Sequence, residues 1–334
     1  MGQGAYILGC QGAHLSSSEA VFFQQADPWG FILFARNVQN PDQLGALTSE
    51  LRSAVGRDAP ILIDQEGGRV QRMTSPHWRQ WLPPLDHILA AGKNAERSMW
   101  LRYRLIADEL RAVGIDANCA PTLDIANAQT HVFLRNRCYG ENSDTVLRIG
   151  RAVADGLTAG GILPVMKHMP GHGRARVDSH AELPRVAESA DTLFAQDFAP
   201  FCGLCDLPIA MTAHIVFESI AAQPATTSPE LIRLIRDGIG FKGVLMTDDI
   251  SMQALGGTVG QRASASLKAG CDMVLHCNGD LKEMDKIAEV SQHMDAASQR
   301  RADEALTTRK QADPIDIDAL EEEIRLLMNG KVYG

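Results

Sequence analysis

The run ILPVMKHM, residues 162–169, is a short apolar segment that ends in a lysine and a histidine. Its apolar residues are nearly continuous instead of alternating with polar ones, which is typical of a parallel strand buried on both faces. Proline and glycine follow at once, in MPGHG, and end the pattern. The stretch therefore predicts a buried parallel strand with ionisable side chains at its carboxyl end.

Seven further runs have the same length and character. They are AYILGCQG (5–12), GFILFARN (30–37), PILIDQEG (60–67), IDANCAPTLD (115–124), PIAMTAHIV (208–216), GVLMTDDI (243–250) and DMVLHCNG (272–279). Amphipathic patterns with a period near 3.6 lie between them. The clearest are PDQLGALTSELRSAV (41–55), AERSMWLRYRLIADELRAVG (95–114), SDTVLRIGRAVADGLTAGG (143–161) and SPELIRLIRDGIG (228–240).

Eight strands that alternate with helices predict an α/β fold, a single-domain (β/α)8 barrel over residues 1–334. A doubly wound parallel sheet is the alternative. The tail DIDALEEEIRLLMNG (316–330) has an aspartate at its start and a glycine at its end. It predicts a C-terminal helix at about 316–329 that covers the barrel.

Composition and charge narrow the class of protein. The 334 residues are 45% hydrophobic and 22% charged, as in soluble globular domains, and their formal net charge is −9. An acidic chain argues against a nucleic-acid partner, because phosphates need a basic face. We see no signal peptide and no apolar run near the ~18 residues of a membrane span. Seven cysteines, an odd number, fit reduced thiols, so we expect a cytoplasmic protein.

The carboxyl ends of the predicted strands are rich in ionisable side chains of catalytic type. Contact with solvent would account for one or two polar residues at these strand ends. It explains less well why most of them are ionisable side chains of catalytic type. They are Asp64, Asp124, Lys167, His168, His214, Asp248, Asp249 and His276. Functional groups of (β/α)8 enzymes collect at this end of the barrel, so we expect these residues to surround one pocket.

The segment IDQEGGRVQR, residues 63–72, places a tight Gly-Gly turn directly after a strand. Asp64 and Arg72 can then both point into the pocket, where a carboxylate and a guanidinium bind sugar hydroxyls. A surface ion pair after a turn is an equal alternative.

The segment KHMPGHGRARVDSH, residues 167–180, holds three histidines. Lys167 and His168 end the strand, and the rest is a loop. Residues i and i+2 of an extended segment face the same way, so Asp178 can orient His180 and stabilise its imidazolium for proton transfer. A turn clamp is the alternative for that pair, and His172 is as well explained by a loop hydrogen bond as by catalysis.

The segments 244–252 and 119–144 supply further candidates. Asp248 lies at a strand end, where a carboxylate can attack an anomeric carbon or bind a metal. We expect Asp249 to cap a helix that begins at residue 250. The long segment 119–144 carries Arg135 and Arg137, and long loops on this face of a barrel usually bind something, although a solvated arginine pair is the alternative.

The three motifs IDQEGGRVQR, KHMPGHGRARVDSH and GVLMTDDISM, in this order and spacing, resemble the bacterial β-N-acetylglucosaminidases of glycoside hydrolase family 3. These are cytoplasmic single-domain enzymes of peptidoglycan recycling. The similarity runs from about Asp64 to about Met252. It implies a retaining glycoside hydrolase that removes β-linked N-acetylglucosamine from muropeptide fragments and uses neither metal nor organic cofactor.

The resemblance also implies a role for each matching residue. Asp248 is the nucleophile, and His180, oriented by Asp178, is the general acid and base. The substrate contacts are Asp64, Arg72, Arg137, Lys167 and His168. Arg137 is chosen over Arg135 because a small residue and an aromatic follow it.

Three other hypotheses stay open at this point. A substrate-assisted hexosaminidase would use the 2-acetamido group and form no covalent enzyme intermediate. A non-catalytic sugar-binding barrel would need only Asp64 and Arg72. A metal-dependent barrel hydrolase would draw its ligands from a larger set. That set is His168, His172, His180, His214 and Asp248. The sequence does not decide the aglycone, the choice between hydrolysis and phosphorolysis, or the oligomeric state. It also leaves open the roles of Arg174 and Arg176 and of the Cys202–Cys205 pair.

Overall fold

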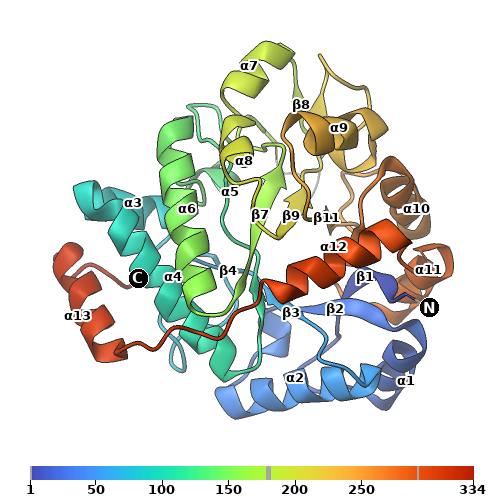
Figure 1. The fold of residues 1–334 in the computed structure, drawn as a ribbon, viewed down its shortest axis with the longest axis horizontal. Coiled ribbons are helices and arrows are strands. Elements are labelled where there is room, and N and C mark those ends of the chain that lie inside the picture. Colours follow the sequence, from blue (N-terminus) through green and yellow to red (C-terminus); the bar gives the residue numbers. More distant parts are fainter. Residues whose placement is uncertain (1, 178–181, 292) are drawn as a thin grey trace.

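The chain forms a closed barrel of eight parallel strands in the computed structural model, which describes residues 2–177, 182–291 and 293–334 (Figure 1). The strands are β1 (Gly4–Gly9), β2 (Pro28–Leu33), β3 (Ile61–Ile63), β6 (Ala117–Asn118), β7 (Leu163–Met169), β9 (Ile209–Thr212), β11 (Val244–Asp249) and β12 (Met273–His276). Each pairs in parallel with the barrel strands before and after it in the chain, and β1 pairs with β12 to close the ring. The predicted (β/α)8 barrel is therefore confirmed, and closure excludes the doubly wound sheet.

Helices surround the barrel. They are α1 (Ser17–Ala26), α2 (Pro41–Val55), α3 (Pro84–Ala91), α4 (Ala95–Ala112), α5 (Val132–Arg135), α6 (Ser143–Ala159), α7 (Ala190–Ala195), α8 (Ala199–Gly203), α9 (Pro229–Arg233), α10 (Val259–Ala269), α11 (Leu281–Ser291), α12 (Ala296–Thr307) and α13 (Ile317–Leu327). Three 3-10 turns are η1 (Ala35–Asn37), η2 (Gly92–Asn94) and η3 (Ala225–Thr227). Among the described residues, no helix is both long and apolar enough to cross a membrane.

Local sequence explains where these helices begin and end. In α2, the Asn40 side chain accepts a hydrogen bond from the Gln43 N–H, Pro41 occupies the first turn, and Gly56 ends the helix at a φ of 65°. The predicted helix 228–240 differs from expectation. It is α-helical only to Arg233 and continues as the wider π-helical turn η4 (Leu234–Gly238).

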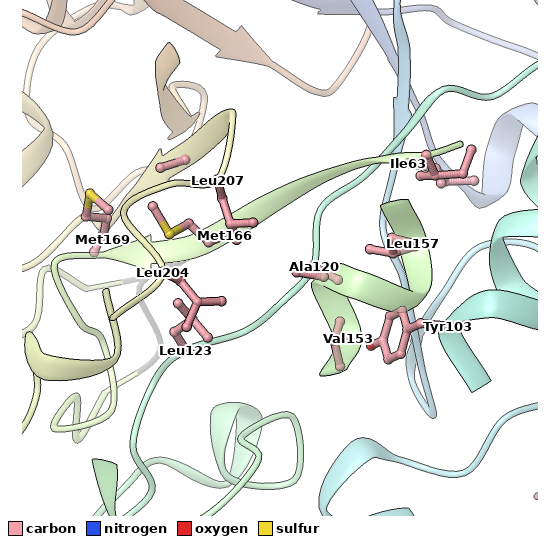
Figure 2. Packing of buried hydrophobic residues seen from close by; sticks show 14 of the residues in the cluster. Ile63, Tyr103, Ala120, Leu123, Val153, Leu157, Met166, Met169, Leu204 and Leu207 are labelled. Atoms are coloured by element: carbon pink, nitrogen blue, oxygen red, sulfur yellow. The ribbon is translucent and has the colours of Figure 1, made fainter. Parts of the chain in front are cut away.

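Both faces of the strands are buried, as the near-continuous apolar runs require. In β7, Leu163 and Val165 belong to the cluster inside the barrel, whereas Met166 faces outward. Figure 2 shows part of the outer cluster, to which Met166, Leu157 and Tyr103 all belong.

The two C-terminal helices have different positions. Ala302 and Ala305 of α12 belong to the cluster inside the barrel, so α12 packs under the strands. The helix α13 packs along α4 in the outer ring (Figure 1). The last residues then return beside Trp81, which forms an isolated bridge with Tyr333.

Two small sheets stand outside the barrel wall. The hairpin β4 (Gln65–Gly67) and β5 (Val70–Gln71) follows β3 directly. The strands β8 (Arg185–Val186) and β10 (Val216–Phe217) pair in parallel. Both sheets follow the carboxyl end of a barrel strand, so they build up the same end of the barrel.

Candidate active site

A cavity opens at the carboxyl ends of the barrel strands. Loops after β3, β6, β7, β11 and β12 contribute to its wall. Its polar lining residues are Asp64, Arg72, His131, Arg137, Lys167, His168, His172, Asp248 and Asp249. Five predicted substrate contacts and the predicted nucleophile thus lie around one space, whereas Asp178 and His180 lie outside the described residues.

Alternating charges form a chain along one side of the cavity. The Lys167 ammonium lies 2.8 Å from Asp64 Oδ1 and 2.6 Å from Glu66 Oε1. Arg72 donates to Asp64 at 3.0 Å, and Arg137 binds Glu66 with two nitrogens at 2.9 and 2.8 Å. Three cations and two carboxylates therefore hold one another in place, in the order Arg72, Asp64, Lys167, Glu66, Arg137.

The ion pairs keep both carboxylates of this array ionised. Burial alone would raise the pKa of Glu66, but Arg137 and Lys167 lower it to about 2. Burial likewise opposes the ionisation of Asp64, and the charges of Lys167 and Arg72 hold its pKa well below the usual range. The side of the cavity is therefore a fixed array of charged donors and acceptors at neutral pH.

The hairpin β4–β5 brings Arg72 back to Asp64. Gln65 Oε1 accepts hydrogen bonds from the Arg72 and Met73 N–H groups at 3.0 and 3.1 Å. Gly67 has a φ of 112°, and a Cβ on it would lie 1.8 Å from Arg102 Nη2. Arg72 and Asp64 do form the ion pair that the sequence offered as an alternative, but the pair lines the cavity instead of standing apart from it.

Glu66 was not among the predicted site residues. It is 1% exposed and binds both Lys167 and Arg137. The signal was present, because Glu66 is two residues beyond Asp64 in an extended segment and such residues face the same way.

Lys167 and His168 both reach the cavity although they are neighbours on β7. A regular strand would point them to opposite faces. The pairing of β7 with β9 shifts register between Met166 and Met169, and this irregularity lets both side chains reach the cavity.

Asp124 is a second site residue that the motifs did not single out, although its place at a strand end was noted. It is fully buried, and its Oδ2 lies 2.7 Å from His168 Nδ1. Its Oδ1 accepts the His172 N–H at 2.6 Å. Burial raises the pKa of Asp124, but the His168 ring outweighs that effect and the pKa is lowered. An ionised Asp124 only accepts, so His168 Nδ1 carries the proton and Nε2 is left for the cavity.

His172 lies in the glycine-bounded part of the loop and is 5% exposed. Its ring packs edge-on against His168, with centroids 5.7 Å apart. Burial and the neighbouring His168 lower its pKa to about 4. His172 is therefore neutral near pH 7, and it both holds the loop to Asp124 and lines the cavity.

Asp248 lies at the end of β11 and lines the same cavity. Its Oδ1 accepts the Asp249 N–H at 2.8 Å. Burial raises the pKa of Asp248, but His214 and His168 nearby lower it overall. His214 itself hydrogen-bonds to the Asp249 carbonyl oxygen at 3.0 Å and to Thr226 Oγ1 at 2.7 Å. The site thus presents an ionised carboxylate to whatever occupies the cavity.

Asp249 does not cap a helix at residue 250, so that prediction is wrong. Its side chain accepts from the Ser251 N–H at 3.0 Å and from Ser251 Oγ at 2.7 Å, and it also accepts the Cys277 N–H at 3.2 Å. An aspartate can close a local turn through the residue two positions on, and here that turn replaces the helix start. The next helix, α10, begins after Thr258, which forms a capping box.

The two arginines of the long loop have different environments. Arg137 is 7% exposed and lines the cavity. Arg135 binds Glu141 at 2.5 Å at the surface and is not among the lining residues. His276 also turns away from the cavity, since its Nε2 binds Glu283 at 2.9 Å, and Cys277 lines the wall in its place.

Within residues 2–177, 182–291 and 293–334, no group of three or more histidine, cysteine, aspartate or glutamate side chains is arranged to hold a metal ion. His180, one of the ligands considered from sequence, lies outside these ranges.

Comparison with known proteins decides the family. The model of the glycosyl hydrolase family 3 N terminal domain matches residues 14–308. The chain belongs to glycosyl hydrolase family 3. Proteins of this family are glycoside hydrolases, and so is this chain. The family resemblance predicted from the three motifs is confirmed.

Curated and structural relatives agree with this assignment. A protein named Beta-hexosaminidase from Methylococcus capsulatus is 39% identical over 277 residues, which are 80% of this chain and 80% of that protein. One of the same name from Alkalilimnicola ehrlichii is 36% identical over 285 residues, or 82% and 81% of the two chains. NagZ from Neisseria gonorrhoeae, solved with a zinc ion, matches with a TM-score of 0.85 at 29% identity and covers 99% of this family 3 chain and 97% of its own. The same protein was also solved with N-trifluoroacetyl-D-glucosamine.

Proposed function

We propose that this family 3 hydrolase is a retaining exo-acting β-N-acetylglucosaminidase that removes N-acetylglucosamine from muropeptide fragments. The observation that carries the proposal is the cavity itself, in which the ion-paired Asp64–Lys167–Glu66 array faces the ionised Asp248. The names of the relatives support the activity, and the N-trifluoroacetyl-D-glucosamine complex of the Neisseria protein supports the sugar.

In this proposal the ion-paired array binds the sugar. Asp64, Arg72 and Lys167 present fixed acceptors and donors, and Arg137 extends the row. Charged groups that are held by one another lose little freedom when they bind hydroxyl groups, so they select one orientation of the sugar ring. His168 presents its Nε2 to the sugar, because its Nδ1 is held by Asp124.

In the first chemical step, Asp248 attacks the anomeric carbon while the bond to the leaving oxygen breaks. His180, protonated and oriented by Asp178, gives its proton to that oxygen. A covalent glycosyl-enzyme results. In the second step the now neutral His180 takes a proton from water, the hydroxide attacks the anomeric carbon, and Asp248 leaves as a carboxylate. Two inversions give net retention of configuration.

The reaction needs no metal or organic cofactor, since protein side chains supply both the nucleophile and the acid/base. The roles of Asp178 and His180 rest on the sequence motif, since these residues lie outside the described ranges. The ionised state of Asp248, to which His214 and His168 contribute, supports its role as nucleophile.

We further propose that residues 1–334 form one catalytic domain with a C-terminal helix, and that the enzyme works in the cytoplasm in peptidoglycan recycling. All seven cysteines are free thiols, which supports a reducing compartment. The partner is a small sugar substrate, with no nucleic acid and no membrane.

The test is release of 4-nitrophenol from its β-N-acetylglucosaminide, with a chelator present, by wild type and by Asp248→Asn. We expect chelator-resistant turnover in wild type and a loss of at least about 1000-fold in the variant, because a neutral amide cannot displace the leaving group. Turnover that the chelator abolishes would instead support a metal-dependent hydrolase.

A further inference from the structure

The loop that carries the proposed acid/base leaves β7 through Gly171 and returns through β8, and one arginine joins its two limbs. Arg174, on the outgoing limb, binds Glu188 on the return limb, with Nη1 to Oε1 at 3.0 Å. Its Nε binds Asp197 at 2.7 Å and its Nη2 binds Gln196 at 2.7 Å, both just after α7. The planar guanidinium thus uses all of its three nitrogens, each with a different partner.

The outgoing limb is fastened to the loop that follows β6 on both sides of Arg174. Thr130 Oγ1 donates to the Gly173 carbonyl at 2.6 Å, and the His131 N–H donates to the Ala175 carbonyl at 2.9 Å. Gly173 also packs so closely on the main chain of residue 125 that a Cβ there would lie 1.9 Å from a carbonyl oxygen. This limb has little freedom to move up to residue 175.

The return limb is fastened separately. β8 pairs with β10, and the Glu218 N–H donates to the Val186 carbonyl at 2.9 Å. Ser219 Oγ donates to the Glu188 carbonyl at 2.6 Å. Arg174 and Glu188 therefore join two limbs, of which one is held to the loop after β6 and the other to β10 and the residues after it.

The side chains of the outgoing limb divide between two sides. Ala175 and Val177 line the sugar cavity. Arg174 points away from the cavity and toward Asp197, which is 5% exposed. Arg176 is exposed, has the same charge as Arg174 and lies on the same limb. It does not form the ion pairs that Arg174 makes with Glu188 and Asp197. It is therefore a matched control for Arg174.

We infer that Arg174 is a positioning residue for proton transfer: at Glu188 and Asp197 it joins the two limbs of the loop whose sequence motif carries the proposed acid/base. The inference rests on the proposed function, because it assumes that His180 is the acid/base. Arg174 does not touch the substrate. Its loss acts on the step in which the leaving oxygen is protonated and leaves sugar binding by the ion-paired array in place.

The experiment compares kcat/KM for three aryl β-N-acetylglucosaminides, of 2,4-dinitrophenol, 4-nitrophenol and phenol, in wild type, Arg174→Ala, Arg174→Lys and Arg176→Ala. 2,4-Dinitrophenolate leaves without a proton, whereas phenolate needs one. Since general acid catalysis contributes about 100- to 10,000-fold, we expect Arg174→Ala to lose at least about 10-fold on the phenyl substrate and less than about 3-fold on the dinitrophenyl one. Arg174→Lys should fall between, and Arg176→Ala should follow wild type.

Equal losses on all three substrates in Arg174→Ala, or no loss on the phenyl substrate, would overturn the inference. If Arg174→Ala does not fold, Arg174→Lys is compared with wild type in the same way. It should again lose more activity on the phenyl substrate than on the dinitrophenyl one, by a smaller factor. A wild type that cleaves none of the three would instead contradict the proposed function.

Discussion

At the scale of single residues, Lys167 determines the charge state of the sugar-binding side of the cavity. It is 2% exposed, and its ammonium lies between Asp64 and Glu66. Removing water from two carboxylates is costly unless cations replace it, and here Lys167, Arg72 and Arg137 do so. The same contacts that place the donors and acceptors for a sugar therefore also contribute to the dependence of stability on pH.

Glu66→Gln tests this link between charge and stability. The pKa of Glu66 falls from 4.5 to about 2 in the folded protein. A lowered folded-state pKa stabilises the protein above pH 4.5, and this contribution is lost as the pH falls toward 2. Urea unfolding at several pH values should therefore show wild type more stable than Glu66→Gln at pH 7, with a difference that shrinks between pH 4.5 and 2. A difference that is constant over this range would contradict the assignment.

Asp124→Asn tests the orientation of His168. The ionised Asp124 accepts the His168 Nδ1 proton, so Nε2 is the nitrogen available to the cavity. An amide can donate to Nδ1 and so favour the tautomer with its proton on Nε2. The nitrogen available to the substrate then has the opposite hydrogen-bonding role. We expect kcat/KM on the 4-nitrophenyl substrate to fall about 100-fold, with an unchanged fold by circular dichroism. A loss below about 3-fold would mean that the contact only packs the loop.

At the scale of elements, the hairpin β4–β5 carries the array into position. Its Gly67 has a φ of 112° and packs against Arg102, which donates to the Leu82 carbonyl at 2.8 Å and also bonds the Glu66 carbonyl. The turn, the buried arginine and the main chain of Glu66 are therefore one packed unit, and the geometry of the site depends on a residue with no functional group.

Gly67→Ala should be far more costly than a glycine replacement without crowding. Both Gly67 and Gly56 have positive φ, but a Cβ at Gly56 would meet nothing within 4 Å. Left-handed strain alone costs about 1–2 kcal/mol, which is the expected loss of unfolding free energy for Gly56→Ala. Gly67→Ala must also displace Arg102, so we expect at least about 3 kcal/mol and a weaker affinity for the sugar. Equal losses in the two variants would show that the hairpin adjusts freely.

Element by element, the sequence predicted what depends on local pattern. The apolar run of β7 is explained by burial on both faces, and the amphipathic pattern of residues 41–55 coincides with α2. The turn of Asp249 could not be predicted, because a helix cap and a local turn use the same side chain and only the surrounding contacts decide between them. The π-helical turn η4 has no sequence signal that we can name.

At the scale of the whole molecule, barrel closure explains why residues far apart in sequence share one site. Asp64 follows β3 directly, and Lys167 and Asp248 lie near the carboxyl ends of β7 and β11. The closed ring points these strand ends to the same side. The polar strand ends predicted this gathering. Which of them face the cavity was not predictable, since Asp124 supports His168 from behind and His276 turns to Glu283, and both depend on contacts across the fold.

The central claim is that Asp248 forms a covalent bond to the sugar, and trapping tests it most directly. A 5-fluoro N-acetylglucosaminyl fluoride keeps the acetamido group and slows release of the intermediate, and peptide mass spectrometry then locates the sugar. The account predicts one added sugar on the peptide that contains Asp248, and none in Asp248→Asn. Rapid release of fluoride by wild type, without any labelled peptide, would contradict it and support participation of the acetamido group instead.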